Sequence, residues 1–116
     1  MNSESDRSVL ILGAGLVSAP VVEYLCRDED LRIRVCSPLR HELERLAARF
    51  SGIETIELDA FRDIDRLKEL CSESYVVVSL LPSHLHGIVA ECCVDSKSHM
   101  VTASYVSEDI RRLHER

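Results

Sequence analysis

The chain has 116 residues, a length typical of one domain, and a formal net charge of −6. Hydrophobic residues make up 46% of it and charged residues 29%, which is ordinary for a globular protein and excludes a disordered one. The acidic balance argues against a nucleic-acid partner, and no apolar run is long enough to span a membrane. Residues 1–7 lack the apolar segment of a signal peptide, so we expect a flexible tail there and one domain over residues 8–116.

The cysteines exclude two further classes of protein. Their number is odd, and the sequence has neither a C-x-x-C pair nor a histidine pattern suited to zinc. We therefore expect reduced thiols with a structural role, an intracellular protein and no metal site. The five cysteines are Cys26, Cys36, Cys71, Cys92 and Cys93.

The first apolar run, residues 9–12, ends at Gly13 and Gly15 and passes directly into a helical pattern. Four apolar residues in a row fit a strand covered on both faces, as in the centre of a parallel sheet. Gly13 allows a tight turn, and Gly15 lets the backbone approach a pyrophosphate, whose charge would sit at the N-terminus of the next helix. The third small position holds Ser18, where the usual fingerprint has glycine or alanine. A glycine-rich turn without a ligand is the alternative interpretation.

This stretch therefore predicts a dinucleotide-binding turn. Its residues are Gly13, Gly15, Leu16, Val17 and Ser18.

Hydrophobic patterns divide the rest of the chain into alternating strands and helices. Apolar or alternating runs predict strands over residues 9–12, 31–36, 53–58, 75–81 and 99–103. Helical spacing predicts helices that begin near residues 17, 38, 64, 84 and 107. In the first helix, the stripe formed by Val17, Val21, Tyr24 and Leu25 predicts the buried face. The second strand alternates apolar with basic residues, so one of its faces should be less covered.

Alternating strands and helices with short connections imply right-handed crossovers and one parallel sheet. The first and fourth strands are almost wholly apolar and belong in the centre, whereas the half-polar second and third strands run outward to an edge. We therefore predict an α/β fold, a Rossmann-type doubly wound parallel sheet of five strands in the order 3-2-1-4-5. Ligands bind such sheets where the order reverses, which brings the glycine turn beside Ser79-Leu80-Leu81-Pro82.

The segment after the second strand bears on which nucleotide would bind. NAD-binding domains usually have an acid there for the ribose hydroxyls, but this chain has Ser37-Pro38, with Arg40 close behind. A serine hydroxyl, the opening N–H groups of a helix and a guanidinium suit the 2′-phosphate of NADP. The alternative is that Ser37 only caps the helix and Arg40 is solvated. After the third strand, Asp59 beside Ala60 could accept from the adenine amino group, or it could be an ordinary loop carboxylate.

With these motifs placed, the sequence resembles the nucleotide-binding domain of the glutamate-forming saccharopine dehydrogenases, including the form found in bifunctional aminoadipic semialdehyde synthases. The glycine stretch, residues 13–20, matches that family's version, including the serine and the proline that depart from the general fingerprint. Residues 79–82 with 85–86, and residues 100–105, match as well. The resemblance covers nearly the whole chain from Val9 onward.

The resemblance implies a step of lysine degradation. Saccharopine is oxidised at a carbon–nitrogen bond, hydride passes to NAD(P), and the imine hydrolyses to glutamate and aminoadipic semialdehyde. In this family a substrate domain follows the nucleotide domain, and we expect it to lie outside this chain. Ser104 and Tyr105 match positions expected to face the nicotinamide and the substrate, although a capping serine and a packing tyrosine are the alternative. No catalytic residue is assigned, and His84 and His86 are interpreted as structural.

Three questions stay open in the sequence. NADP is favoured over NAD by Ser37 and Arg40, but family members differ on this point. A homo-oligomer is neither indicated nor excluded. The rival hypothesis is a stand-alone dinucleotide-sensing regulatory domain of a transport system, although such domains usually carry an acid after the second strand and Gly-Asp after the third, where this chain has Leu58-Asp59.

Overall fold

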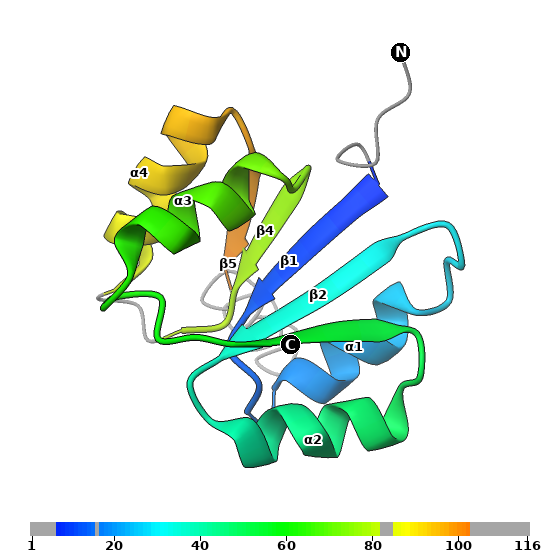
Figure 1. Ribbon diagram of the computed structural model, residues 1–116. Helices are drawn as coiled ribbons and strands as arrows, with labels where there is room; N and C mark the ends of the chain where they lie inside the picture. Colours follow the sequence, from blue (N-terminus) through cyan, green and yellow to red (C-terminus); the bar gives the residue numbers. More distant parts are fainter. Residues whose placement is uncertain (1–6, 16, 82–84, 103–116) are drawn as a thin grey trace, which may run out of the picture.

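A computed structural model describes residues 7–15, 17–81 and 85–102 (Figure 1). Strands and helices alternate along these residues, and none of the helices in them is long and apolar enough to cross a membrane. The strands are β1 (Ser8–Leu12), β2 (Arg32–Ser37), β3 (Ile53–Glu57), β4 (Val76–Ser79) and β5 (His99–Thr102). The helices are α1 (Ser18–Leu25), α2 (Arg40–Arg49), α3 (Ile64–Ser72) and α4 (His86–Ser96). The last predicted helix, from residue 107, lies outside the described residues.

The five strands form one parallel sheet in the order β3-β2-β1-β4-β5, which confirms the predicted topology. At the carboxyl end of β1, Leu12 is in register with Cys36 of β2 and with Ser79 of β4. The chain passes from β1 outward to β3 and then returns to β4 on the other side of β1. The order of the strands therefore reverses between β1 and β4.

Helices cover the sheet on two faces (Figure 1). Successive side chains of a strand point to opposite faces, so β1 contributes Val9 and Ile11 to one core and Leu10 and Leu12 to the other. The first core lies under α1 and α2 and includes Val22 and Leu43 on those helices. The second lies under α3 and α4, and its other large members are Leu67, Leu70, Val77 and Val89. We call the two sides of the sheet the α1–α2 face and the α3–α4 face.

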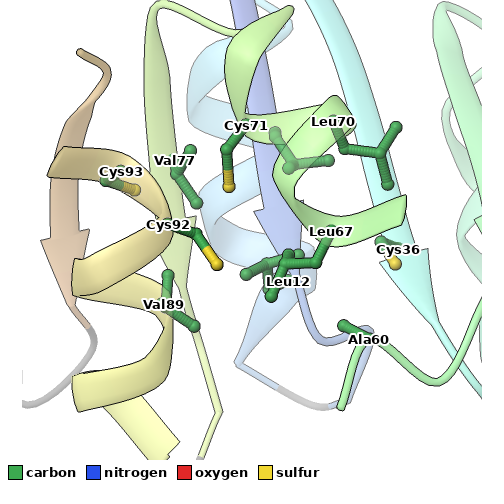
Figure 2. Packing of buried hydrophobic residues seen from close by; sticks show 11 residues of the cluster. Leu12, Cys36, Ala60, Leu67, Leu70, Cys71, Val77, Val89, Cys92 and Cys93 are labelled. Carbon is green, nitrogen blue, oxygen red and sulfur yellow. The ribbon is translucent and has the colours of Figure 1, made fainter. Parts of the chain in front are cut away.

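Cysteines supply much of the core on the α3–α4 face (Figure 2). Cys36, Cys71, Cys92 and Cys93 are buried in it, and none of the five cysteines forms a disulfide. Burial raises the pKa of the Cys36 thiol to about 11. The hydrogen bond between Cys71 and Cys93 raises the pKa of the first thiol and lowers that of the second. These thiols pack as small apolar side chains, the structural role predicted for them.

The predicted buried face of α1 is confirmed for Val21 and Leu25, which pack against the core, and is wrong for Val17 and Tyr24. Val17 and Tyr24 are 59% and 69% exposed, whereas Ser18 and Val22 are fully buried against the sheet. The apolar stripe exists, but it is turned sideways and lines a groove beside α1. The helix therefore contacts the core through Ser18 and Val22, with Val21 and Leu25 partly buried against it, and the exposed part of the stripe lines that groove.

The prediction of a less covered face on β2 fails at Arg34, which is 4% exposed. Its Nη1 donates to Glu73 Oε1 at 2.8 Å, and its Nη2 donates to Ser74 Oγ at 2.9 Å and to the Leu70 carbonyl at 3.4 Å. Both Nη atoms of the guanidinium thus donate to acceptors at the C-terminal end of α3. These hydrogen bonds offset the cost of burying a charged side chain there. Arg32, on the same side of the strand, is exposed and pairs with Glu54 across β3 at 2.8 Å.

Candidate functional site

The carboxyl ends of β1 and β4 lie side by side, and a turn follows each strand. The backbone N–H of Gly13 donates to the Cys36 carbonyl at 2.8 Å, and that of Leu80 donates to the Leu12 carbonyl at 2.9 Å. Each turn is therefore tied to the carboxyl end of a neighbouring strand. This is the edge and the topological switch point at which open α/β sheets bind their ligands.

Gly13 has a backbone conformation that other residues rarely adopt, with φ of +109°. A Cβ at this position would lie 3.4 Å from the Leu80 Cβ, which is ordinary contact. The requirement for glycine is therefore conformational, because the chain must turn sharply out of β1. The structure confirms a tight turn at this position.

Gly15 differs from Gly13 in both conformation and surroundings. Its φ is not in the positive region, and among the described residues the one atom within 4 Å of a Cβ placed there would be Glu42 Oε2, at 4.0 Å. The space in front of the Gly15 backbone is therefore open, as it must be for a phosphate to approach closely. Leu16, the next residue of the predicted turn, lies outside the described residues.

Ser18 explains the unusual third position of the glycine stretch. It is fully buried, and its Oγ donates to the Gly15 carbonyl at 2.5 Å while its N–H donates to the same oxygen at 3.1 Å. The serine thereby closes the turn on itself and brings α1 against the sheet. Val17 stands at the N-cap position of α1, where no side chain caps the helix. The Ser18 N–H is bound to the Gly15 carbonyl, and the N-terminal N–H groups of α1 have no side-chain acceptor at the cap.

The end of β2 differs from the prediction. Ser37 is the last residue of the strand, and Leu39, not Ser37, stands at the N-cap position of α2. The Ser37 Oγ accepts from the Leu39 N–H at 3.1 Å, so the hydroxyl shapes the turn between strand and helix. Arg40 pairs through Nε with Glu57 at 2.8 Å, and this hydrogen bond raises the pKa of the guanidinium.

Arg40 nevertheless remains accessible, because its side chain is 74% exposed. An ion pair that exposed contributes little stability, so an incoming phosphate could take the place of the Glu57 carboxylate. Glu42 was missed by the sequence analysis. Glu42 lies in the first turn of α2, and nothing in the sequence around it indicates a functional role. Its proximity to Gly15 is visible only in the folded chain.

At the end of β3, Asp59 and Ala60 also have structural roles, and the Asp59 side chain remains 45% exposed. The Asp59 Oδ1 accepts from the Phe61 N–H at 3.2 Å, and its Oδ2 lies 3.7 Å from Arg62 Nε. Ala60 is buried in the core of the α3–α4 face. Asp59 therefore organises the turn that leads to α3, which is the loop role left open by the sequence.

β4 ends at Ser79, whose buried Oγ has no hydrogen-bond partner among the described residues. Two residues further on, the Leu81 carbonyl lies within hydrogen-bond distance of His86 Nε2, at 2.9 Å. His86 thus holds the turn, as expected for a structural histidine. Pro82 and His84, and the predicted substrate-facing pair Ser104 and Tyr105, lie outside the described residues.

A five-stranded parallel sheet in this order, with a glycine turn where the order reverses, defines a nucleotide-binding domain of the Rossmann class. Residues 9–116 match the family described as the saccharopine dehydrogenase NADP binding domain, and the chain belongs to that family. The match confirms the resemblance seen in the sequence and the expected cofactor, NADP or NAD. It also favours a dehydrogenase over a sensor domain of a transport system.

Known relatives are longer than this chain. Mitochondrial alpha-aminoadipic semialdehyde synthase from Rattus norvegicus is 36% identical over 97% of the chain, which spans 12% of that protein. Saccharopine dehydrogenase [NADP(+), L-glutamate-forming] from Saccharomyces cerevisiae is 33% identical over 92% of the chain, which spans 24% of it. The solved apo form of the Saccharomyces cerevisiae enzyme superposes with a TM-score of 0.77 at 33% identity, over 92% of this chain and 24% of that one. The X-ray structure of Pen from Bacillus thuringiensis, 17% identical with a TM-score of 0.66, shares the fold.

Proposed function

We propose that this chain is the cofactor-binding part of a saccharopine dehydrogenase, which oxidises saccharopine with NAD(P) to glutamate and aminoadipic semialdehyde in lysine degradation. The observation that carries the proposal is the open space in front of Gly15, at the switch point of the sheet, in a member of this family. The residues present fit a dinucleotide because a Cβ at Gly15 would fill space that a pyrophosphate needs. When bound, the cofactor supplies the hydride acceptor.

We assign each predicted contact to one part of the cofactor or substrate. The pyrophosphate would lie on the backbone of residues 13–18 and at the N-terminus of α1, and the adenosine ribose beyond the end of β2 near Ser37 and Arg40. The adenine would lie near Asp59 and Ala60, and the nicotinamide near Ser79, Leu80, Leu81 and Pro82. Ser104 and Tyr105 would face the substrate, whose remaining contacts would come from protein outside these 116 residues.

NADP is the expected preference over NAD. The supporting observation is Arg40, which is exposed and whose partner Glu57 an incoming phosphate can replace. A ligand at one hundred times its dissociation constant stabilises the protein by about 2.7 kcal/mol, so thermal denaturation with equal concentrations of NADP and NAD reports the preference. Arg40→Ala should remove the difference and leave NAD binding unchanged. Arg49→Ala, at the other end of α2, is the matched control. A larger stabilisation by NAD in the unmodified protein would overturn the preference.

The chain alone should not turn over saccharopine, because hydride transfer requires the substrate carbon to be held against the nicotinamide. Absorbance of NAD(P)H with saccharopine, compared between this chain and one extended through a substrate domain, tests this division of labour. Turnover by the short chain at a rate near that of the long one would contradict it. We further propose that the protein is intracellular and has no nucleic-acid or membrane partner. Fractionation would distinguish mitochondrion from cytoplasm, and the molar mass in solution would show whether it is a homo-oligomer.

A further inference from the structure

The α1–α2 face of the sheet is unevenly covered. Figure 1 shows α3 and α4 together over one side of the sheet, whereas α1 and α2 lie toward its β2–β3 half on the other. Over β4 and β5, the side chains that point to the α1–α2 face remain accessible, and Val101 is 43% exposed. Among the described residues, no helix covers this part of the sheet.

The uncovered surface forms a groove of about 700 Å³ beside α1. Its floor includes Val76, Val78 and Val101, and its wall includes Pro20 and Tyr24 of α1. Tyr24 belongs to the apolar stripe of α1, and the three valines belong to β4 and β5. The sequence pattern predicts burial for both groups. We call this surface, with its neighbours in α1, β4 and β5, the apolar groove.

The shape of the apolar groove fits a helix. It extends from Thr102 at the carboxyl edge of the sheet to Tyr75 at the amino edge. Strands of four or five residues span about 13–17 Å, the length of about ten residues of α-helix. Parallel sheets are covered by helices on both faces because their strands are apolar on both sides. The missing element is therefore a helix with one apolar stripe.

We propose that the apolar groove is the docking site for an amphipathic helix from the substrate-binding part of the same enzyme, outside this chain. The inference rests on the proposed function. The chain spans only 24% of the yeast dehydrogenase that it matches, so in that protein the domain is joined to a much larger partner. A helix of that partner would bury the floor of the apolar groove, as the core of a domain interface does.

The position of the apolar groove supports this occupant. Val17 and Leu80 line its carboxyl end, and both also belong to the turns around the predicted cofactor site. Leu80 lies next to Gly13, and a Cβ on that glycine would be 3.4 Å from the Leu80 Cβ. A helix seated in the apolar groove therefore ends beside the nicotinamide side of the cofactor site. That is where a substrate-binding part has to be held for hydride transfer.

The first test uses this chain alone. A monomer should bind a hydrophobic dye such as anilinonaphthalene sulfonate in the apolar groove, and Val101→Asp and Tyr24→Glu should each reduce the bound fluorescence at least twofold. Ala48→Asp, on the exposed side of α2, is the matched control and should leave it unchanged. Tyr24→Glu guards against a folding defect, because its side chain is exposed on a helix. Two results would identify another occupant and overturn the proposal. A dimer that Val101→Asp dissociates would point to a second copy of this chain, and dye binding that appears only after removal of residues 103–116 would point to that segment.

The second test joins this chain to the yeast saccharopine dehydrogenase in place of its matching quarter. The fusion should lose dye binding, and Val101→Asp or Tyr24→Glu should restore it and lower saccharopine oxidation at least tenfold, whereas Ala48→Asp should change neither. NADP affinity of the isolated variants should stay within twofold of the unmodified chain. A fusion that binds dye as strongly as the isolated chain, including one whose parts do not associate, overturns the proposal. Loss of NADP binding by the unmodified chain would instead count against the proposed function.

Discussion

The two glycines of the turn should separate folding from binding. Gly13→Ala places a side chain on a residue with φ of +109°, and a conformation of that kind costs a non-glycine residue about 1–3 kcal/mol. Contact with Leu80 adds little, because the new Cβ would lie at an ordinary 3.4 Å. The melting temperature should fall by about 4–12 °C, since 1 kcal/mol corresponds to about 4 °C in a domain of this size.

Gly15→Val is the matched variant, because its backbone needs no positive φ and the side chain would enter open space. The free energy of unfolding should change by less than about 1 kcal/mol, whereas the affinity for either dinucleotide should fall at least tenfold. Thermal denaturation followed by circular dichroism measures the first quantity, and calorimetric titration with NADP and NAD measures the second. Equal melting temperatures for Gly13→Ala and the unmodified chain, or unchanged affinity in Gly15→Val, would refute this division between the two glycines.

The two arginines of β2 should respond differently to removal. Arg34→Met should lower the free energy of unfolding by about 1–3 kcal/mol, because buried acceptors lose their donor, and an unchanged urea midpoint would argue against this. Arg32→Ala should cost less than about 1 kcal/mol. The hydrogen bond from Arg32 holds the pKa of Glu54 below its usual 4.5, so this contribution is present above about pH 4.5 and disappears as pH falls through the lowered value. Stability curves of the two proteins that diverge on acidification would contradict this. With a thiol reagent at pH 8, Cys26 should react before the four buried cysteines. Burial raises the pKa of Cys36 to about 11, so that thiol stays protonated at this pH. Equal reaction rates for Cys26 and Cys36 would show that the core is open to the reagent.

The strand order could be predicted because it depends on a coarse property, the polarity of whole strands. β1 and β4 are flanked on both sides by other strands, and their runs of valine, leucine and isoleucine mark this central position. The polar residues of β3 similarly mark an edge. The need for glycine at position 13 was also predictable, since a sharp turn after a buried strand limits the choice of residue.

The orientation of individual side chains was less predictable, because it depends on contacts between distant segments. Arg34 can be buried because it binds Glu73 and Ser74. These partners lie 39 and 40 residues away in the sequence, so the burial could not be predicted from the residues around Arg34. Val17 and Tyr24 of the α1 stripe were wrongly expected to be buried, because periodicity shows that a face is apolar but does not show what covers it. The same limit explains why Glu42 was missed, because it lies in α2 and comes near Gly15, in the turn after β1, only in the folded chain.

The hydrogen bonds at the carboxyl edge also determine how the turn can behave over time. The N–H of Gly13 is bound to β2, that of Leu80 to β1, and that of Leu58 to the Ser37 carbonyl at 3.0 Å. The first residue of each of these loops is thus fastened to the neighbouring strand and cannot leave it without breaking that hydrogen bond. A nucleotide that arrives at this edge meets these three positions already in place, so none of its binding energy is spent on ordering them. The backbone at Gly13, Leu58 and Leu80 should accordingly keep its position when the nucleotide binds.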